Sequence, residues 1–304
     1  MKVDLTTTLG KLVLKNPVLV SSGTFGYGLE YKDLVEVEEL GAVVLKTVTL
    51  KPRQGNPPPR IWETPSGMLN AIGLQNEGLE DLLNNKLPLL KKLKVPLIAN
   101  IAGETIDEYV KLANRLDSVK EIRAIELNVS CPNVKKGCLS FGENAELLAE
   151  LVKAVRRVTG KTLITKLTPN VTDILSIARR AEGAGSDVLS LVNTFLGMAI
   201  DTKTRRPRLA NITGGLSGPA IRPIAVRMVW QVAKAVKVPV IGMGGITSLE
   251  DALEFIMAGA TAVSIGTANF INPRIAIEII DGLKKYMKDN KIKDLAEIRG
   301  KLVG

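Results

Sequence analysis

A cysteine follows an apolar run in a chain that contains no histidine. The cysteine is Cys131, in the sequence Asn128-Val129-Ser130-Cys131-Pro132-Asn133, just past the apolar run at residues 122–129. A general base in this protein cannot be an imidazole, and a cysteine thiol can act as one where its pKa falls towards the working pH. The alternative is that Cys131 is a small apolar residue of the interior, as most free cysteines are.

Polar residues and glycines end each of eight short apolar runs. If these runs are parallel strands of one barrel, their carboxyl ends meet on a single rim, where barrel enzymes carry their chemistry. Lysines on such a rim can also simply extend to water, but two lysines and three asparagines together favour a polar pocket. The residues at the run ends are Ser22, Lys46, Asn100, Asn128, Lys166, Asn193, Gly244-Gly245 and Gly266-Thr267.

The last two of these turns predict a phosphate site. Gly244 and Gly245 lead into a helical pattern, and Gly266-Thr267 ends the eighth run. Exposed backbone N–H groups and a helix N-terminus can converge there on one phosphate. The alternative is that these are tight turns that need glycine for their φ angles.

The runs alternate with helical-period segments, which favours parallel pairing and a (β/α)8 TIM barrel formed by one domain, residues 1–304. An open doubly wound sheet is less favoured, because no G-x-G-x-x-G follows the first run. A pair of strands at 3–5 and 12–14, around Gly10, predicts an N-terminal β-hairpin at the barrel bottom. The eight strands are expected at 18–21, 42–45, 96–99, 122–129, 163–167, 187–192, 238–242 and 260–265, with helices at 143–157, 173–182, 221–236 and 248–257.

The composition is that of a soluble protein, with 45% hydrophobic and 24% charged residues in 304. No apolar run reaches the ~20 residues of a membrane span, and the start of the chain does not resemble a signal peptide, so we expect a cytoplasmic location. Lysines alternate with acids despite a net charge of +10, which argues against nucleic-acid binding. Only two cysteines occur, Cys131 and Cys138, too few for a disulfide scaffold or a zinc site, and no metal is expected.

Several longer motifs resemble one family, the class 1B dihydroorotate dehydrogenase catalytic subunits. The resemblance covers essentially the whole chain and implies a flavin-dependent barrel. Its most specific pieces are Asn70-Ala71-Ile72-Gly73-Leu74-Gln75-Asn76, residues 128–142, Asn193-Thr194 with 197–201, and residues 214–220.

The resemblance implies one FMN per chain. Lys166 is expected near the N1 and O2 edge of the flavin, where a fixed positive charge would stabilise the reduced anion. The positions that match the family's flavin contacts are Ser22, Lys46, Thr47, Asn100, Asn128, Lys166, Val192, Gly218, Gly244, Gly245, Gly266 and Thr267.

The resemblance also implies that the chain binds dihydroorotate, a planar anion whose carboxylate and ring amides suit lysine and asparagine side chains. Cys131 and Lys166 are the expected catalytic residues. Cys131 would remove the proton from C5 while hydride passes from C6 to flavin N5, and residues 131–142 would form a lid, with Cys138 as a spacer. The expected substrate contacts are Lys46, Asn70, Ala71, Ile72, Gly73, Leu74, Asn128, Asn193 and Thr194.

Reoxidation of the flavin implies a partner, because two cysteines cannot hold a cluster that needs four ligands. The family relationship implies an electron-transfer subunit with FAD and [2Fe-2S] that reaches NAD, in a heterotetramer around a homodimer core. The proline-rich residues 51–65 are an ordered loop candidate near the substrate or an interface.

The sequence leaves four other functions open. They are a fumarate-linked class 1A enzyme, a dihydropyrimidine dehydrogenase-like enzyme, a catalytically idle flavin-binding scaffold, and a flavin-free aldolase that uses Lys166.

Overall fold

Eight parallel strands close into a barrel in the computed structural model, which describes residues 3–130 and 141–303. Each strand overlaps one of the eight predicted runs, so the predicted (β/α)8 barrel is confirmed. Around the barrel the order is β10 (Val188–Leu191), β15 (Val240–Met243), β16 (Ala262–Ile265), β3 (Val18–Val20), β4 (Ala42–Val44), β7 (Leu97–Ile101), β8 (Ile122–Asn128) and β9 (Thr162–Lys166).

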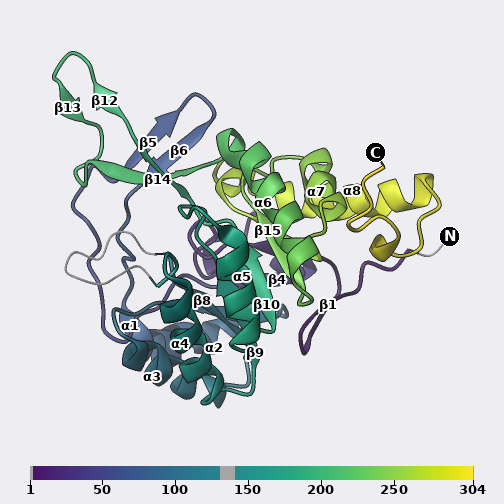
Figure 1. Cartoon of the computed structure of the whole chain (residues 1–304), viewed down its shortest axis with the longest axis horizontal. Coiled ribbons are helices and arrows are strands. Elements are labelled where there is room, and N and C mark those ends of the chain that lie inside the picture. Colours follow the sequence, from purple (N-terminus) through teal and green to yellow (C-terminus); the bar gives the residue numbers. More distant parts are fainter. Residues whose placement is uncertain (1–2, 131–140, 304) are drawn as a thin grey trace.

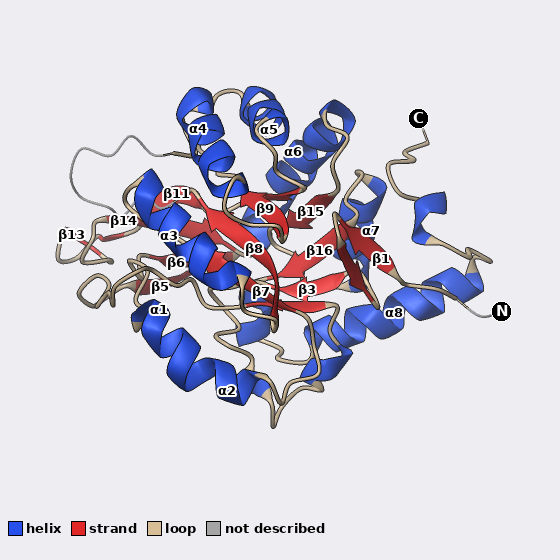
Figure 2. Ribbon diagram, turned by 90° about the horizontal axis from the view of Figure 1, so that it is seen from below, coloured by secondary structure: helices blue, strands red, loops and turns tan. Residues whose placement is uncertain are grey.

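Helices surround this barrel (Figures 1 and 2), and their apolar faces pack against the outward side chains of the strands. Their starts follow local capping chemistry. For example, α4 (Ala145–Arg156) begins after Asn144, whose side chain accepts hydrogen bonds from the N–H groups of Glu146 and Leu147. The other helices are α1 (Gly78–Asp81), the π-helical turn η3 (Leu82–Lys86), α2 (Leu87–Leu90), α3 (Ile106–Asp117), α5 (Ile174–Gly183), α6 (Arg222–Ala235), α7 (Leu249–Met257) and α8 (Ile275–Asp289).

Short 3-10 turns complete the connections: η1 (Leu29–Tyr31), η2 (Val37–Glu39), η4 (Pro219–Ile221), η5 (Thr267–Phe270) and η6 (Leu295–Glu297). Among the helices of the described ranges, none is both long enough and apolar enough to cross a membrane.

A β-hairpin precedes the barrel, as predicted, but its first strand was misplaced. The strands are β1 (Thr7–Leu9) and β2 (Leu12–Leu14), whereas residues 3–5 had been expected to form the first. Leu9 pairs with Leu12, which leaves a two-residue turn at Gly10, where φ is +58°. A two-residue turn brings together residues that are close to the glycine on both sides. The first strand therefore has to end next to Gly10 and cannot be formed by residues 3–5.

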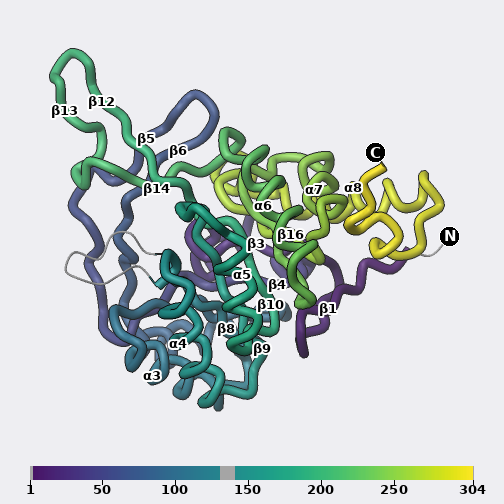
Figure 3. The backbone as a smooth tube through the Cα atoms, viewed as in Figure 1, coloured from purple at the N-terminus to yellow at the C-terminus, as the bar shows by residue number. Residues whose placement is uncertain are grey.

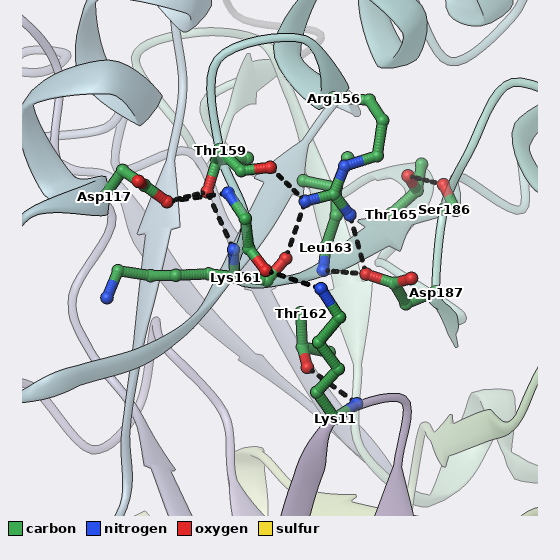
Figure 4. A network of polar contacts seen from close by, with 11 residues as sticks. Lys11, Asp117, Arg156, Thr159, Lys161, Thr162, Leu163, Thr165, Ser186 and Asp187 are labelled. Atoms are coloured by element: carbon green, nitrogen blue, oxygen red, sulfur yellow. Dashed lines mark hydrogen bonds and ion pairs between the residues drawn. The ribbon is translucent and has the colours of Figure 1, made fainter.

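The hairpin plugs the amino-terminal end of the barrel. Its three buried leucines pack in one cluster with inward side chains from all eight strands: Leu9, Leu12 and Leu14 with Leu19, Ala42, Val44, Ile98, Ala124, Ile164, Val188, Ile241, Met243 and Ala262. At the turn, the Lys11 N–H donates to Thr162 Oγ1 at 3.1 Å (Figure 4). Nearby, Arg156 Nη1 lies 2.7 Å from Asp187 Oδ2. The predicted position of the hairpin at the barrel bottom is therefore confirmed.

A second, antiparallel sheet projects from the opposite end of the molecule and was not predicted (Figures 1 and 3). The sheet is formed by two long connections, one after β4 and one after β10. Each connection leaves the barrel and later returns to it. Its order is β11 (Phe195–Met198), β14 (Thr213–Ser217), β6 (Gly67–Asn70) and β5 (Ile61–Thr64), and a small hairpin of β12 (Ile200–Asp201) and β13 (Arg206–Pro207) extends it. The proline-rich residues 51–65 thus end in strand β5.

Candidate active site

A cavity of about 1340 Å³, its open mouth included, lies at the carboxyl ends of the barrel strands. A concave site with converging polar side chains at this end of a barrel is where barrel enzymes bind their ligands. Most of the predicted site residues line it: Ser22, Lys46, Thr47, Asn70, Ile72, Gly73, Leu74, Asn128, Lys166, Val192, Asn193, Thr194, Gly218, Gly244, Gly245, Gly266 and Thr267. Cys131 and Cys138 lie outside the described residues.

Strand alternation explains why these side chains meet. Residues two apart on a strand point to the same side, so the inward position after Ile164 on β9 is Lys166. In the same way, Asn128 is the second inward position after Ala124 on β8. The barrel interior therefore changes from apolar to polar as the strands approach their carboxyl ends.

Ala71 and Asn100 are the two described residues of the predicted site that do not line the cavity. Asn100 is fully buried, and its amide is held between the Thr47 hydroxyl and the Glu126 carboxylate, at 2.5 Å from each. Ala71 is also fully buried, and its carbonyl accepts a hydrogen bond from Asn56 Nδ2 at 2.9 Å. Both residues therefore support the site through neighbouring polar groups and do not line the cavity.

Two amide side chains meet in the wall of the cavity. Asn193 Nδ2 donates to Asn128 Oδ1 at 3.4 Å, and Asn193 Oδ1 accepts from the N–H of Thr194 at 2.8 Å. The Tyr109 hydroxyl donates to the backbone carbonyl of Asn128 at 2.7 Å. The sequence did not predict that Tyr109 of α3 contacts the site, because a tyrosine on the apolar face of an amphipathic helix indicates only a core residue.

Lys46 carries a positive charge into the cavity at a cost. Burial lowers the pKa of its ammonium, and the nearby Arg60 guanidinium lowers it further. An anion bound beside Lys46 would offset both effects, since an opposite charge favours the ionised form. Arg60 was not predicted, because nothing in the proline-rich sequence around it shows that the chain turns back towards Lys46.

Lys166 is the second lysine of the site, and its residue is only 7% exposed. The Ser130 hydroxyl donates to the Lys166 backbone carbonyl at 3.3 Å, which ties the end of β8 to the end of β9. Ser130 also lines the cavity and immediately precedes Cys131 in the sequence. The last described residue before Cys131 therefore lies in the cavity wall.

The glycine turns form one end of the cavity. A Cβ added at Gly266 would meet only Ser21 Oγ, at 3.8 Å, so this backbone is open to a ligand. Gly245 has φ +75°, and a Cβ there would come within 2.7 Å of the Gly218 carbonyl oxygen. Thr267 Oγ1 donates to Ser217 Oγ at 2.8 Å. Gly245 is thus required by its turn, whereas the open backbone at Gly266 has room for the phosphate of FMN.

The sequence also predicts that the N-terminus of the helix after Gly245 binds the phosphate, but this helix start has hydrogen-bond partners within the chain. Ser248 caps α7, and the Asp251 carboxylate accepts hydrogen bonds from both the N–H and the hydroxyl of Thr247. The Arg222 guanidinium pairs with the same carboxylate, so this helix start holds an ion pair of its own. The fit to a phosphate therefore depends on the two glycine turns themselves.

The barrel fold and a polar cavity at its carboxyl end define the class of (β/α)8-barrel enzymes. The family model for dihydroorotate dehydrogenase matches residues 4–287, and this chain belongs to that family of oxidoreductases.

Its relatives include proteins named dihydroorotate dehydrogenase B (NAD(+)), catalytic subunit. One from Trichlorobacter lovleyi is 56% identical over 304 residues, which is 100% of both chains. Another from Desulforamulus reducens is 56% identical over 300 residues, 99% of both chains, and one from Thermoanaerobacter is 54% identical over 300 residues, also 99% of both.

Proposed function

We propose that this chain is a single-domain FMN-containing catalytic subunit, residues 1–304, that oxidises dihydroorotate to orotate in the synthesis of UMP. The observation that carries the proposal is one cavity in which open glycine turns and a set of lysines and asparagines meet. The family to which the chain belongs and the names of its relatives support the same activity.

The substrate end of the cavity suits an anion with ring amides. Lys46 would pair with the carboxylate of dihydroorotate, which would restore the ammonium that burial and Arg60 disfavour. Asn70, Asn128 and Asn193 each offer an acceptor oxygen and a donor NH₂, the two groups that a dihydropyrimidine ring requires. Thr194 and the backbone of residues 72–74 complete this wall.

The other end of the cavity would hold FMN. When bound, FMN supplies the acceptor for the hydride that leaves C6 of the substrate. Gly244, Gly245, Gly266 and Thr267 would bind the phosphate, and Lys166 would hold a positive charge beside the ring. Ser22, Thr47, Val192 and Gly218 line the remaining wall.

Cys131 would take the proton from C5. The residue before it, Ser130, lines the cavity, and a thiolate is a competent base where its surroundings favour ionisation. No histidine competes for this role, because the chain has none.

Electrons would leave through a second subunit that carries FAD and [2Fe-2S] and reduces NAD. The words "catalytic subunit" and "NAD(+)" in the relatives' names support such a partner. We propose a cytoplasmic heterotetramer built on a homodimer of this chain.

The test is to add dihydroorotate to the purified, FMN-loaded chain without oxygen and to follow the visible flavin absorbance. We expect the absorbance to bleach quickly in the natural chain and in Cys138→Ala, and far more slowly in Cys131→Ala. A flavin-loaded chain that does not bleach with dihydroorotate would contradict the proposed reaction. Equal bleaching in Cys131→Ala would contradict the assignment of the base.

A further inference from the structure

A carboxylate with no role in the reaction above is buried inside the barrel. Glu126 lies on β8 and is 1% exposed. Its Oε2 accepts a hydrogen bond from Asn100 Nδ2 at 2.5 Å, and its Oε1 accepts one from Ser190 Oγ at 2.8 Å. Burying a carboxyl group is costly, so an apolar side chain would be expected here if the residue only filled space.

Glu126 is the inner part of a hydrogen-bonded chain that reaches the cavity. Asn100 Oδ1 accepts from the Thr47 hydroxyl at 2.5 Å, and Thr47 lines the cavity while Asn100 does not. The chain runs from Ser190 on β10 through Glu126 and Asn100 to Thr47, just beyond β4. A buried group is thereby connected to the wall of the binding site across the barrel.

The chemistry of Glu126 sets the direction of every bond in this chain. The Glu126 carboxylate has no N–H, and it accepts a hydrogen bond from the NH₂ end of the Asn100 amide. The oxygen end of that amide then faces Thr47, whose single hydroxyl hydrogen is used to reach it. The Thr47 oxygen is therefore left with lone pairs only, and a ligand group that contacts it must be a donor.

We propose that Glu126 is a positioning residue that makes the Thr47 hydroxyl an obligate acceptor, and so selects a ligand that presents an N–H to this wall. This inference rests on the proposed function, in which the ligand is FMN. The oxidised flavin ring has one N–H, that of its imide. The Thr47 oxygen would accept a hydrogen bond from this N–H. A neutral amide in place of Glu126 could face Asn100 with either end, so the selection would be lost.

The experiment measures which flavin the full-length chain retains. The chain is stripped of flavin, offered an equal mixture of FMN and FMN methylated at the imide nitrogen, and the bound flavins are quantified by chromatography. Methylation removes the donor, so the natural chain should prefer FMN by about tenfold or more, the range expected for one lost buried hydrogen bond with a steric clash. Equal retention of the two flavins would overturn the inference.

Two variants then test the role of Glu126. Glu126→Gln should lower the preference for FMN several-fold, because the amide chain can now run in either direction. The double variant Glu126→Gln with Asn100→Asp should restore the preference, since a carboxylate at position 100 again accepts from Thr47. A merely structural role for Glu126 predicts no such rescue, and an unchanged preference in Glu126→Gln or an unrestored one in the folded double variant would overturn the inference.

Controls separate these results from folding and from the proposed function. Ser186→Ala removes another buried hydroxyl, the one 2.5 Å from Thr165 Oγ1, and should leave the preference unchanged. If Glu126→Gln does not fold, Thr47→Val removes the acceptor directly and should lower the preference several-fold, to the part that comes from the steric clash, and an unchanged preference would overturn the inference. A natural chain that retains neither flavin overturns the proposed function as well, whereas FMN retention without preference overturns this inference alone.

Discussion

The two ends of the barrel are formed by the same eight strands and carry opposite chemistry. At the amino-terminal end, leucines of the β1–β2 hairpin pack against apolar side chains from every strand. At the carboxyl end, the next inward positions are polar and surround a large cavity. One end is therefore filled and contributes stability, while the other is left open at the expense of packing, because a ligand must enter there.

The first prediction concerns the polar end and carries the largest effect. Lys166→Met removes a buried positive charge from the site while it keeps an unbranched side chain only one atom shorter. Loss of one group that stabilises developing charge typically costs about 10²–10³ in rate, so we expect flavin reduction by dihydroorotate to slow by this factor. Stopped-flow absorbance measures the rate.

The melting temperature of Lys166→Met should stay within a few degrees of the natural chain. Reduction at the natural rate would remove Lys166 from the reaction.

The second prediction concerns the filled end. Leu9→Ala empties part of the plug, where Leu9 is fully buried, and should lower the free energy of unfolding by about 2–5 kcal/mol. Denaturant titration of the flavin-loaded chain measures it. Val13→Ala is the matched control on the same hairpin, because Val13 is 63% exposed, and its effect should be small.

If Leu9→Ala weakened substrate affinity as strongly as it lowered the free energy of unfolding, the division of the barrel into a stabilising end and a binding end would be wrong.

The third prediction sharpens the electrostatic difference between the ends. Lys46→Gln should raise the KM for dihydroorotate by about 10–100-fold, the loss expected for one charged hydrogen bond in a partly buried site. The natural chain should also lose affinity as pH rises, and sooner than an ordinary lysine would allow, because burial and Arg60 lower the pKa of Lys46.

The sign follows from the charge. The ammonium attracts the anion at low pH, and its proton is lost as pH rises through the lowered pKa. Steady-state KM measured across alkaline pH checks this, and Lys46→Gln should show a flatter profile. An identical pH profile in both proteins would assign the dependence to another group.

The smallest effect is expected from a methyl group. Gly266→Ala places a Cβ on the open backbone of the glycine turn without a clash, so folding should be unaffected while FMN retention falls by up to about tenfold. Gly160→Ala is the control at the opposite end, where a Cβ would meet nothing within 4 Å. Equilibrium dialysis of FMN compares the two, and equal retention would argue against a phosphate at Gly266.

The sequence predicted the barrel well because its signals are local. Each strand of the barrel is a short apolar run, and each run ends at a residue such as Lys46 or Lys166 whose position on the rim follows from strand polarity alone. The first strand of the hairpin was misplaced by a few residues, since alternation continues on both sides of Thr7 and only pairing with β2 decides the register.

Other parts of the site depend on contacts between distant residues. Arg60 approaches Lys46 because residues 51–65 fold back, and the Asn100 amide is oriented towards Thr47 by Glu126, which lies 26 residues later in the chain. The antiparallel sheet joins residues near 65 to residues near 215, and neither segment alternates strongly enough to be recognised alone.

By itself, the sequence determined the strands of the barrel, the end at which the polar residues gather and the family resemblance, because periodicity and motif spacing are properties of neighbouring residues. The tertiary structure alone decided which polar residues face the cavity and which support it, and how each amide is oriented. Burial and hydrogen-bond partners arise from residues that are far apart in the chain, so no local pattern encodes them.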